Sequence, residues 1–126
     1  MGSMKSHEWA RIAAWIETEG SIIACRTHGG SNRYKARIQI SQKHKEPLAW
    51  LQERIGGSFR QDEKGTWRLV LSSGRAYDAL KGAMPYFISP NKRAQARLAL
   101  RLSRGLADEK TREIHDELQA IKRLRG

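Results

Sequence analysis

The residues of this sequence whose types and spacing could support chemistry lie in one stretch, WARIAAWIETEGS, residues 9–21. We predict a helix over residues 6–19, with one stripe of small residues and an acid at spacings of three and four: Ala10, Ala13, Ala14 and Glu17. Glu17 and Glu19 fall in its last turn, where the helix dipole disfavours acids. Gly20 can take the left-handed conformation that ends a helix. Two acids at this end need compensation, and a metal cation is one candidate.

The chain is strongly basic, with 24 Lys and Arg against 13 Asp and Glu in 126 residues, a net charge of +11. A folded domain this basic most often binds a polyanion, and nucleic acid is the leading candidate. An acidic membrane surface is the weaker alternative, because no stretch is apolar enough to span a bilayer. Cys25 is the only cysteine, which excludes an internal disulfide and favours an intracellular, non-secreted protein. We interpret residues 1–3 as a cloning scar and 4–126 as a single domain.

Two hairpins must follow the first helix. β-Forming residues over 21–28 and a strict alternation over 33–41 predict two strands around a turn at 29–32. In the second strand, polar residues alternate with Tyr34, Ala36, Ile38 and Ile40, so one face packs on a core and the other points outward. A solvated face explains such a pattern about as often as a binding face does. The outward set contains cations and no acid, which favours a nucleic-acid surface.

The remaining pattern repeats this plan once and then adds helices. We predict a helix over 44–55, strands over 58–62 and 66–72, and helices over 74–84, 91–104 and 107–124. The fold class is therefore α+β, in the order αββαββα, with extra C-terminal helices. The expected architecture is a four-stranded antiparallel saddle with one cationic face and helices on the other.

Residues 12–20, IAAWIETEG, resemble the LAGLIDADG motif, and Ser21 and Ile22 continue it as is common in that family. The predicted order of elements is also similar to that of LAGLIDADG homing endonucleases, to about Leu102. Members with one motif act as homodimers, and this chain has one copy. The resemblance implies an intron- or intein-encoded nuclease. It would make double-strand breaks in a long pseudo-palindromic DNA site by metal-dependent phosphodiester hydrolysis.

The resemblance also implies roles for individual residues. The motif helices of two subunits would pack at a twofold axis through Ala10, Ala13, Ala14 and Glu17, although Ala14 replaces the usual glycine. Glu19 would bind Mg²⁺, or another divalent cation such as Mn²⁺ or Ca²⁺, together with Gly20. Gln42 would order water and Lys92 would stabilise the phosphate, which gives three catalytic residues: Glu19, Gln42 and Lys92. Glu46 stands where the family often has a basic residue, and Lys43 or Lys45 is the alternative.

Base contacts would come from the outward face of the sheet. We expect these positions to bind DNA: Ile23, Cys25, Thr27, Arg33, Lys35, Arg37, Gln39, Ser41, Arg60, Asp62, Arg68 and Val70. Simpler explanations exist for each assignment: a helix that packs within its own domain, a solvated strand end at Gln42, and a phosphate contact without chemistry at Lys92. Two other functions also suit the scaffold, namely a non-catalytic DNA-binding regulator and an RNA intron maturase.

Overall fold

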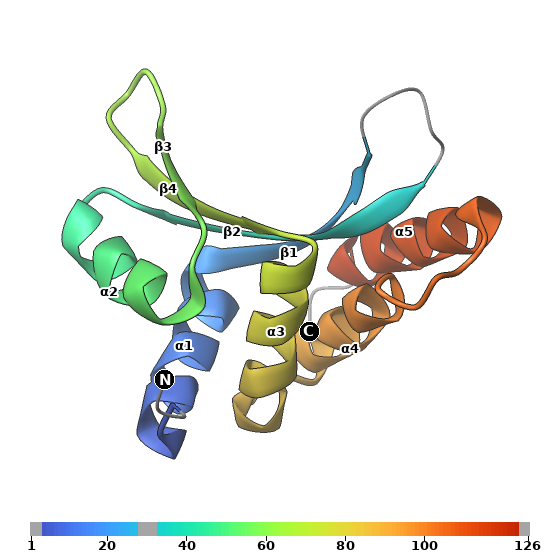
Figure 1. Cartoon of the computed structure of the whole chain (residues 1–126), viewed down its shortest axis with the longest axis horizontal. Coiled ribbons are helices and arrows are strands. Elements are labelled where there is room, and N and C mark those ends of the chain that lie inside the picture. The colour runs from blue at the N-terminus through green and yellow to red at the C-terminus, as the bar shows by residue number, and fades with distance from the viewer. Residues whose placement is uncertain (1–3, 28–32, 124–126) are drawn as a thin grey trace.

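Five α-helices lie on one side of a bent four-stranded sheet in the part of the chain that the computed structural model describes, residues 4–27 and 33–123 (Figure 1). The elements are α1 (Ser6–Glu19), β1 (Gly20–Arg26), β2 (Tyr34–Gln42), α2 (Lys45–Ile55), β3 (Ser58–Gln61), β4 (Trp67–Ser72), α3 (Gly74–Ala83), the 3₁₀ turn η1 (Met84–Tyr86), α4 (Pro90–Arg101) and α5 (Asp108–Arg123). All strand pairs are antiparallel, in the order β1-β2-β4-β3. The predicted α+β class and element order are confirmed.

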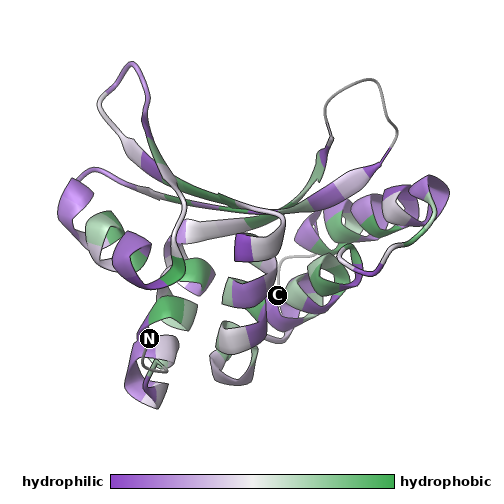
Figure 2. Cartoon of the chain, in the orientation of Figure 1, coloured by the Kyte–Doolittle hydropathy of each residue, from purple (hydrophilic) through white to green (hydrophobic). Residues whose placement is uncertain are grey.

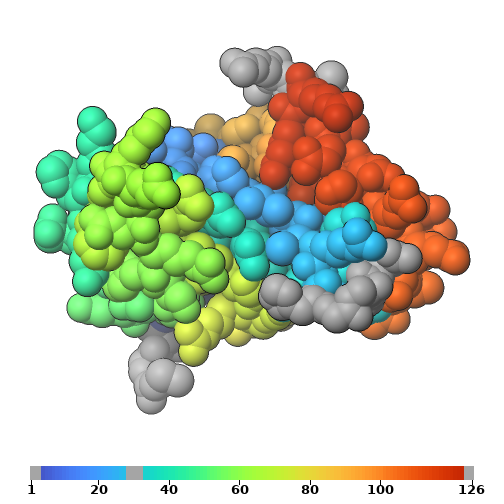
Figure 3. All heavy atoms as spheres, turned by 90° about the horizontal axis from the view of Figure 1, so that it is seen from above, coloured from blue at the N-terminus to red at the C-terminus, as the bar shows by residue number. Residues whose placement is uncertain are grey.

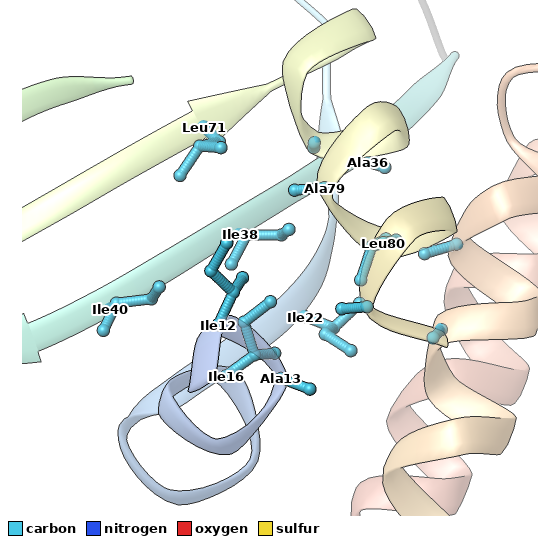
Figure 4. Packing of buried hydrophobic residues seen from close by; sticks show 14 of the residues in the cluster. Ile12, Ala13, Ile16, Ile22, Ala36, Ile38, Ile40, Leu71, Ala79 and Leu80 are labelled. Carbon is cyan, nitrogen blue, oxygen red and sulfur yellow. The ribbon is translucent and has the colours of Figure 1, made fainter. Parts of the chain in front are cut away.

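The hydrophobic core lies between the sheet and the helices beneath it. Alternate strand residues turn into it, among them Ile22, Ile38, Ile40 and Leu71, all fully buried. The helix α1 contributes a stripe at helical spacing, Ile12, Ala13 and Ile16, which contacts the sheet from below (Figure 4). Hydrophilic and hydrophobic residues alternate along α4 and α5 (Figure 2), as expected for helices with one buried face.

The junction between α1 and β1 differs from the prediction. Gly20 does not end the helix in a left-handed conformation but has φ −104° and ψ 159°, and it is already the first residue of the strand. A Cβ at Gly20 would lie 2.8 Å from the carbonyl oxygen of Ile16 and 2.9 Å from its Cα. The glycine is required for space, because the chain passes from helix to strand without a turn. The prediction of a left-handed cap is therefore wrong.

The closest approach between α1 and α3 occurs where the ring of Trp9 lies on Gly82. In an open helix, replacing glycine by alanine stabilises by about 1 kcal/mol. Here the added Cβ would overlap the Trp9 ring, so we expect Gly82→Ala to lower the free energy of unfolding by about 1–3 kcal/mol. Denaturant titration measures the change. Gly74→Ala in the same helix is the control, since a Cβ there meets nothing within 4 Å; equal stabilisation by both variants would contradict the prediction.

Candidate active site and nucleic-acid interface

The outward face of the sheet carries most of the predicted DNA-binding residues in one register. Across β1 and β2, Ile23 lies opposite Arg37 and Cys25 opposite Lys35. Across β2 and β4, Ser41 lies opposite Arg68. Viewed from above, β1, β2, β4 and β3 form one continuous surface between the flanking helices (Figure 3). This cationic sheet face contains the residues Ile23, Cys25, Lys35, Arg37, Gln39, Ser41, Arg60 and Arg68, with Thr27 beyond the end of β1.

Like charges meet directly on this face. Arg60 in β3 is the cross-strand partner of Arg68 in β4. Like charges placed opposite each other destabilise a strand pair. Within the described residues, neither guanidinium forms an ion pair with a carboxylate. The repulsion between the two arginines is offset when an anion binds to both of them. A phosphate group of a nucleic-acid backbone is an anion of this kind.

Among the predicted contact residues, two form bonds within the chain and a third is nearly buried. The Arg33 guanidinium donates to the Leu106 carbonyl and lies 3.5 Å from the Asp108 carboxylate, so it ties β2 to the start of α5. The Asp62 carboxylate accepts from the backbone N–H groups of Lys64 (2.9 Å) and Thr66 (3.0 Å), which closes the β3–β4 turn. Val70 lies opposite Gln39 of β2 and Ser58 of β3 and is only 8% exposed. Their predicted contacts with DNA remain predictions, and the intramolecular bonds of Arg33 and Asp62 and the burial of Val70 weigh against them.

The end of α1 places an exposed acid beside a half-buried lysine. Glu19 is the last residue of α1, and its carboxylate is exposed. The next residue, Gly20, accepts a hydrogen bond at its carbonyl oxygen from Lys92 Nζ, at 3.2 Å. Lys92 is 72 residues away in the sequence, so this bond brings α4 to the predicted centre. We call Glu19, Gly20 and Lys92 the α1-end cluster.

Lys92 is held in an unfavourable place for a cation. It lies in the first turn of α4, where the helix dipole disfavours positive charge. Ser89 caps this helix, its hydroxyl accepting from the Lys92 backbone N–H at 3.2 Å. Burial lowers the pKa of the Lys92 ammonium, and the negative charge of Glu17 partly opposes this shift. A cation kept at such a position indicates a role other than stability.

The two acids of α1 make different contacts, and Glu17, which we predicted at the dimer interface, is bound within its own chain. Its carboxylate accepts from the backbone N–H groups of Ile88 (3.0 Å) and Ser89 (2.7 Å) and so fixes the start of α4. Ala13 is also removed from the predicted dimer stripe, because it is fully buried in its own core. The exposed face of α1 instead presents Ala10, Ala14 and Thr18. Thr18 was missed, although it lies four residues after Ala14.

Gln42 lies at the end of β2, two residues beyond the Gly20 partner Ile40. Its side-chain oxygen accepts from the Lys43 backbone N–H at 2.9 Å, which leaves the amide nitrogen free to contact water in this arrangement. Lys45 is directed away, with Nζ 4.8 Å from the centre of the Trp67 ring and 5.0 Å from that of Phe59. Lys43 and Lys45 were the alternatives to Glu46 as the basic residue of the centre. Lys43 is exposed and, unlike Lys45, does not lie over an aromatic ring among the described residues.

The described residues of one chain offer few ligands for a metal ion. The described residues contain no group of three or more His, Cys, Asp or Glu side chains that could surround an ion. The Glu19 carboxylate and the Gly20 carbonyl are hard oxygen donors of the kind that Mg²⁺ and Ca²⁺ prefer. The carbonyl keeps a second lone pair beside its bond to Lys92. The donor set therefore fits a divalent cation that takes its other ligands from a second subunit, water or substrate.

The residues near the α1-end cluster form an open surface. A hollow of about 200 Å³ beside it is lined by Arg11, Ala14, Trp15, Thr18 and Glu19. A larger hollow of about 650 Å³ lies elsewhere, between the far end of β2 and the start of α3. An exposed centre beside a broad cationic face suits a large polyanion better than a small enclosed substrate. No helix among the described residues is long and apolar enough to cross a membrane.

Comparison with known proteins identifies the fold. No protein-family profile and no curated protein sequence matches the chain. Among solved structures, the homing endonuclease I-CvuI in complex with DNA is 21% identical, with a TM-score of 0.76, over 94% of this chain and 84% of that one. The homing endonuclease I-TnaI is 18% identical, with a TM-score of 0.59, over 97% of this chain and 98% of that one.

A longer neighbour matches in part. The LAGLIDADG homing endonuclease I-SmaMI, bound to cleaved DNA, is 19% identical with a TM-score of 0.63; the match covers 96% of this chain and 43% of that one. This chain therefore corresponds to less than half of that protein. At these identities the likeness establishes the fold. The chain has the fold of the LAGLIDADG homing endonucleases, as the resemblance implied.

Proposed function

We propose that this protein is a site-specific, divalent-metal-dependent DNA endonuclease that acts as a homodimer. The observation that carries the proposal is the hydrogen bond from Lys92 to the Gly20 carbonyl, which brings a half-buried ammonium to the residue after the exposed Glu19. Burying the Lys92 ammonium lowers the stability of the protein, and a protein that only bound DNA would gain nothing from a cation at this position. The solved neighbours with this fold include endonucleases bound to DNA, which supports the same reading.

The residues divide the work of phosphodiester hydrolysis as follows. Water adds to phosphorus, the bond to the leaving sugar oxygen breaks, and that oxygen takes up a proton. Glu19 and the Gly20 carbonyl would hold the cation, which supplies charge stabilisation and an acidified water when bound. Lys92 faces the charge that develops on the phosphate oxygens. Gln42 would orient water at the edge of the centre.

The substrate would be double-stranded DNA lying across the cationic sheet face. Arginine and glutamine side chains there match the acceptor and donor patterns of guanine and adenine in the major groove. Two copies related by a twofold axis would read the two halves of a pseudo-palindromic site. The match to less than half of the I-SmaMI chain supports an assembly of two such units.

The test is a selection of cleaved duplexes from a randomised DNA library with magnesium present. We expect recurrent cleavage of one long, roughly symmetric sequence. Sequence-specific binding without cutting in magnesium or manganese would instead establish the regulator, and preferential binding of structured RNA would establish the maturase. The mass in solution, measured by light scattering, separates the dimer from the monomer.

The exposed face of α1 gives a direct test of the dimer. Ala14 is exposed, and Ala10 and Thr18 flank it on the same helical face. Arginine at this position would hold two helices apart and add like charge at the axis, so we expect Ala14→Arg to give a monomer that no longer cuts both strands. The control is Ala107→Arg, at an exposed alanine between α4 and α5. A dimeric Ala14→Arg variant would contradict this interface.

A further inference from the structure

The helix α5 runs antiparallel to β1 and brings its last turn to the α1-end cluster. Near its start, the Thr111 hydroxyl accepts from the Tyr34 backbone N–H at 3.0 Å, and Tyr34 pairs with Arg26 at the far end of β1. Eleven residues of helix separate Thr111 from Lys122, a rise of about 16 Å. Along β1, the six residue steps from Arg26 back to Gly20 span about 20 Å. The two elements therefore end in the same region.

A buried polar relay fixes this end of α5 against the start of α4. Gln95, only 5% exposed, donates from its side-chain nitrogen to Asn91 Oδ1. Asn91 in turn donates from Nδ2 to the Ile121 carbonyl at 3.0 Å. Asn91 is the neighbour of Lys92, and Ile121 is the neighbour of Lys122. The relay therefore ties the first turn of α4, which carries Lys92, to the last turn of α5, which carries Lys122.

The same order is visible at the surface. Along one long edge of the molecule in Figure 3, the blue of α1, the orange of α4 and the red end of α5 follow one another. Lys122 is half-buried, and burial first and the positive charge of Lys92 second lower its pKa. Within the described residues, neither lysine forms an ion pair with a carboxylate.

Lys92 and Lys122 lie on two helix ends that the Asn91–Ile121 bond holds together, so their half-buried positive charges repel and lower the stability of the free protein. An anion between them reverses the sign of that interaction, because each cation then faces a negative charge. The α5 dipole favours a cation in the last turn, but this favours the exposed Arg123 equally and gives no reason to keep Lys122 half-buried. The anion available to a DNA-binding protein is the phosphodiester group.

We propose that Lys122 is a second phosphate-binding cation of the active centre, delivered by the last turn of α5 and acting beside Lys92. The proposal rests on the proposed endonuclease function and adds a residue to it. Lys122 binds a phosphate oxygen at or next to the bond that is cut. It therefore contributes both to DNA affinity and to the stabilisation of charge during hydrolysis.

The experiment compares Lys122→Met with Arg123→Met, which removes a cation from the same last turn. A duplex is first selected by binding to the parent protein in calcium, so that the probe does not depend on cleavage. Affinity for this duplex is then measured at several salt concentrations, and single-turnover cleavage is measured in magnesium. Thermal melting checks that the variants are folded, and Lys122→Arg serves as the variant that keeps a cation.

We expect Lys122→Met to slow cleavage about 10²-fold. The slope of log affinity against log salt should fall by about 0.9, the value of one phosphate contact. Arg123→Met and Lys122→Arg should retain the parent slope. Parent-like cleavage and slope in Lys122→Met would overturn the proposal while leaving the endonuclease intact. A parent that binds without cutting would refute the endonuclease, and the slope alone would then decide on Lys122. A parent that binds no duplex would refute both.

Discussion

Glu19→Gln is expected to abolish cleavage while the protein still folds and binds its DNA target. The substitution keeps the size of the side chain but removes the negative charge that would hold a divalent cation. Because Glu19 is exposed and makes no contact within the described chain that stability requires, the melting temperature should stay close to that of the parent. Loss of the cation removes charge stabilisation and the acidified water together, so the rate should fall by about 10³-fold or more.

The matched comparison is Glu17→Gln, two residues earlier on the same helix. Its carboxylate accepts two backbone hydrogen bonds at the start of α4. An amide oxygen can still accept them, though less strongly, so we expect a lower melting temperature and only a modest loss of cleavage. Single-turnover cleavage and affinity in calcium separate the two effects. Equal loss of cleavage in both variants with equal destabilisation would refute the assignment of metal binding to Glu19.

The second large effect is expected at Lys92, where activity and stability should move in opposite directions. Lys92→Met removes the ammonium beside the Gly20 carbonyl and should slow cleavage by about 10²–10³-fold. Methionine fills a similar volume without a charge to bury. We therefore expect a higher melting temperature at neutral pH, the usual trade between function and stability at an active centre.

The pH dependence of that stabilisation has a definite sign. Burial lowers the pKa of Lys92 in the folded protein relative to the unfolded chain. Below the lowered pKa, the folded protein therefore carries the full unfavourable charge on Lys92. As pH rises, the folded protein loses this proton before the unfolded chain does, so the free energy of unfolding rises with pH. The advantage of Lys92→Met should be largest at neutral pH and shrink as pH approaches the ordinary lysine value. Melting curves at several pH values measure it, and a constant difference would contradict the assignment.

Strand faces could be predicted from the sequence because period two is a local property. The alternation over 33–41 assigned Ile38 and Ile40 to the core and Lys35 and Arg37 to the outer face, and burial and register agree. The motif at residues 12–20 similarly located the end of α1. What links these elements in space, such as the bond from Lys92 to Gly20, came only from the resemblance to the family.

The contacts that the sequence did not predict share one cause, which is that local pattern does not reveal long-range partners. Glu17 and Ala13 lie on the predicted stripe of α1, but one reaches α4 and the other faces the core. Arg33 has the parity of a contact residue, yet it binds the connection before α5. The position of Lys122 could not be predicted for the same reason, since nothing in the last helix indicates which strand end it approaches.

The alternation of β2 has a consequence for how this protein can change over generations. Substitutions at Lys35, Arg37 or Gln39 alter what the sheet offers to a ligand, while those at Ala36, Ile38 or Ile40 alter how tightly the interior is filled. The two sets alternate along one strand, but the first contributes to the free energy of binding and the second to the free energy of folding. Ligand preference can therefore change during evolution while the fold is kept. Arg33 is an exception, because replacing it would also remove its bonds to Leu106 and Asp108 at the start of α5.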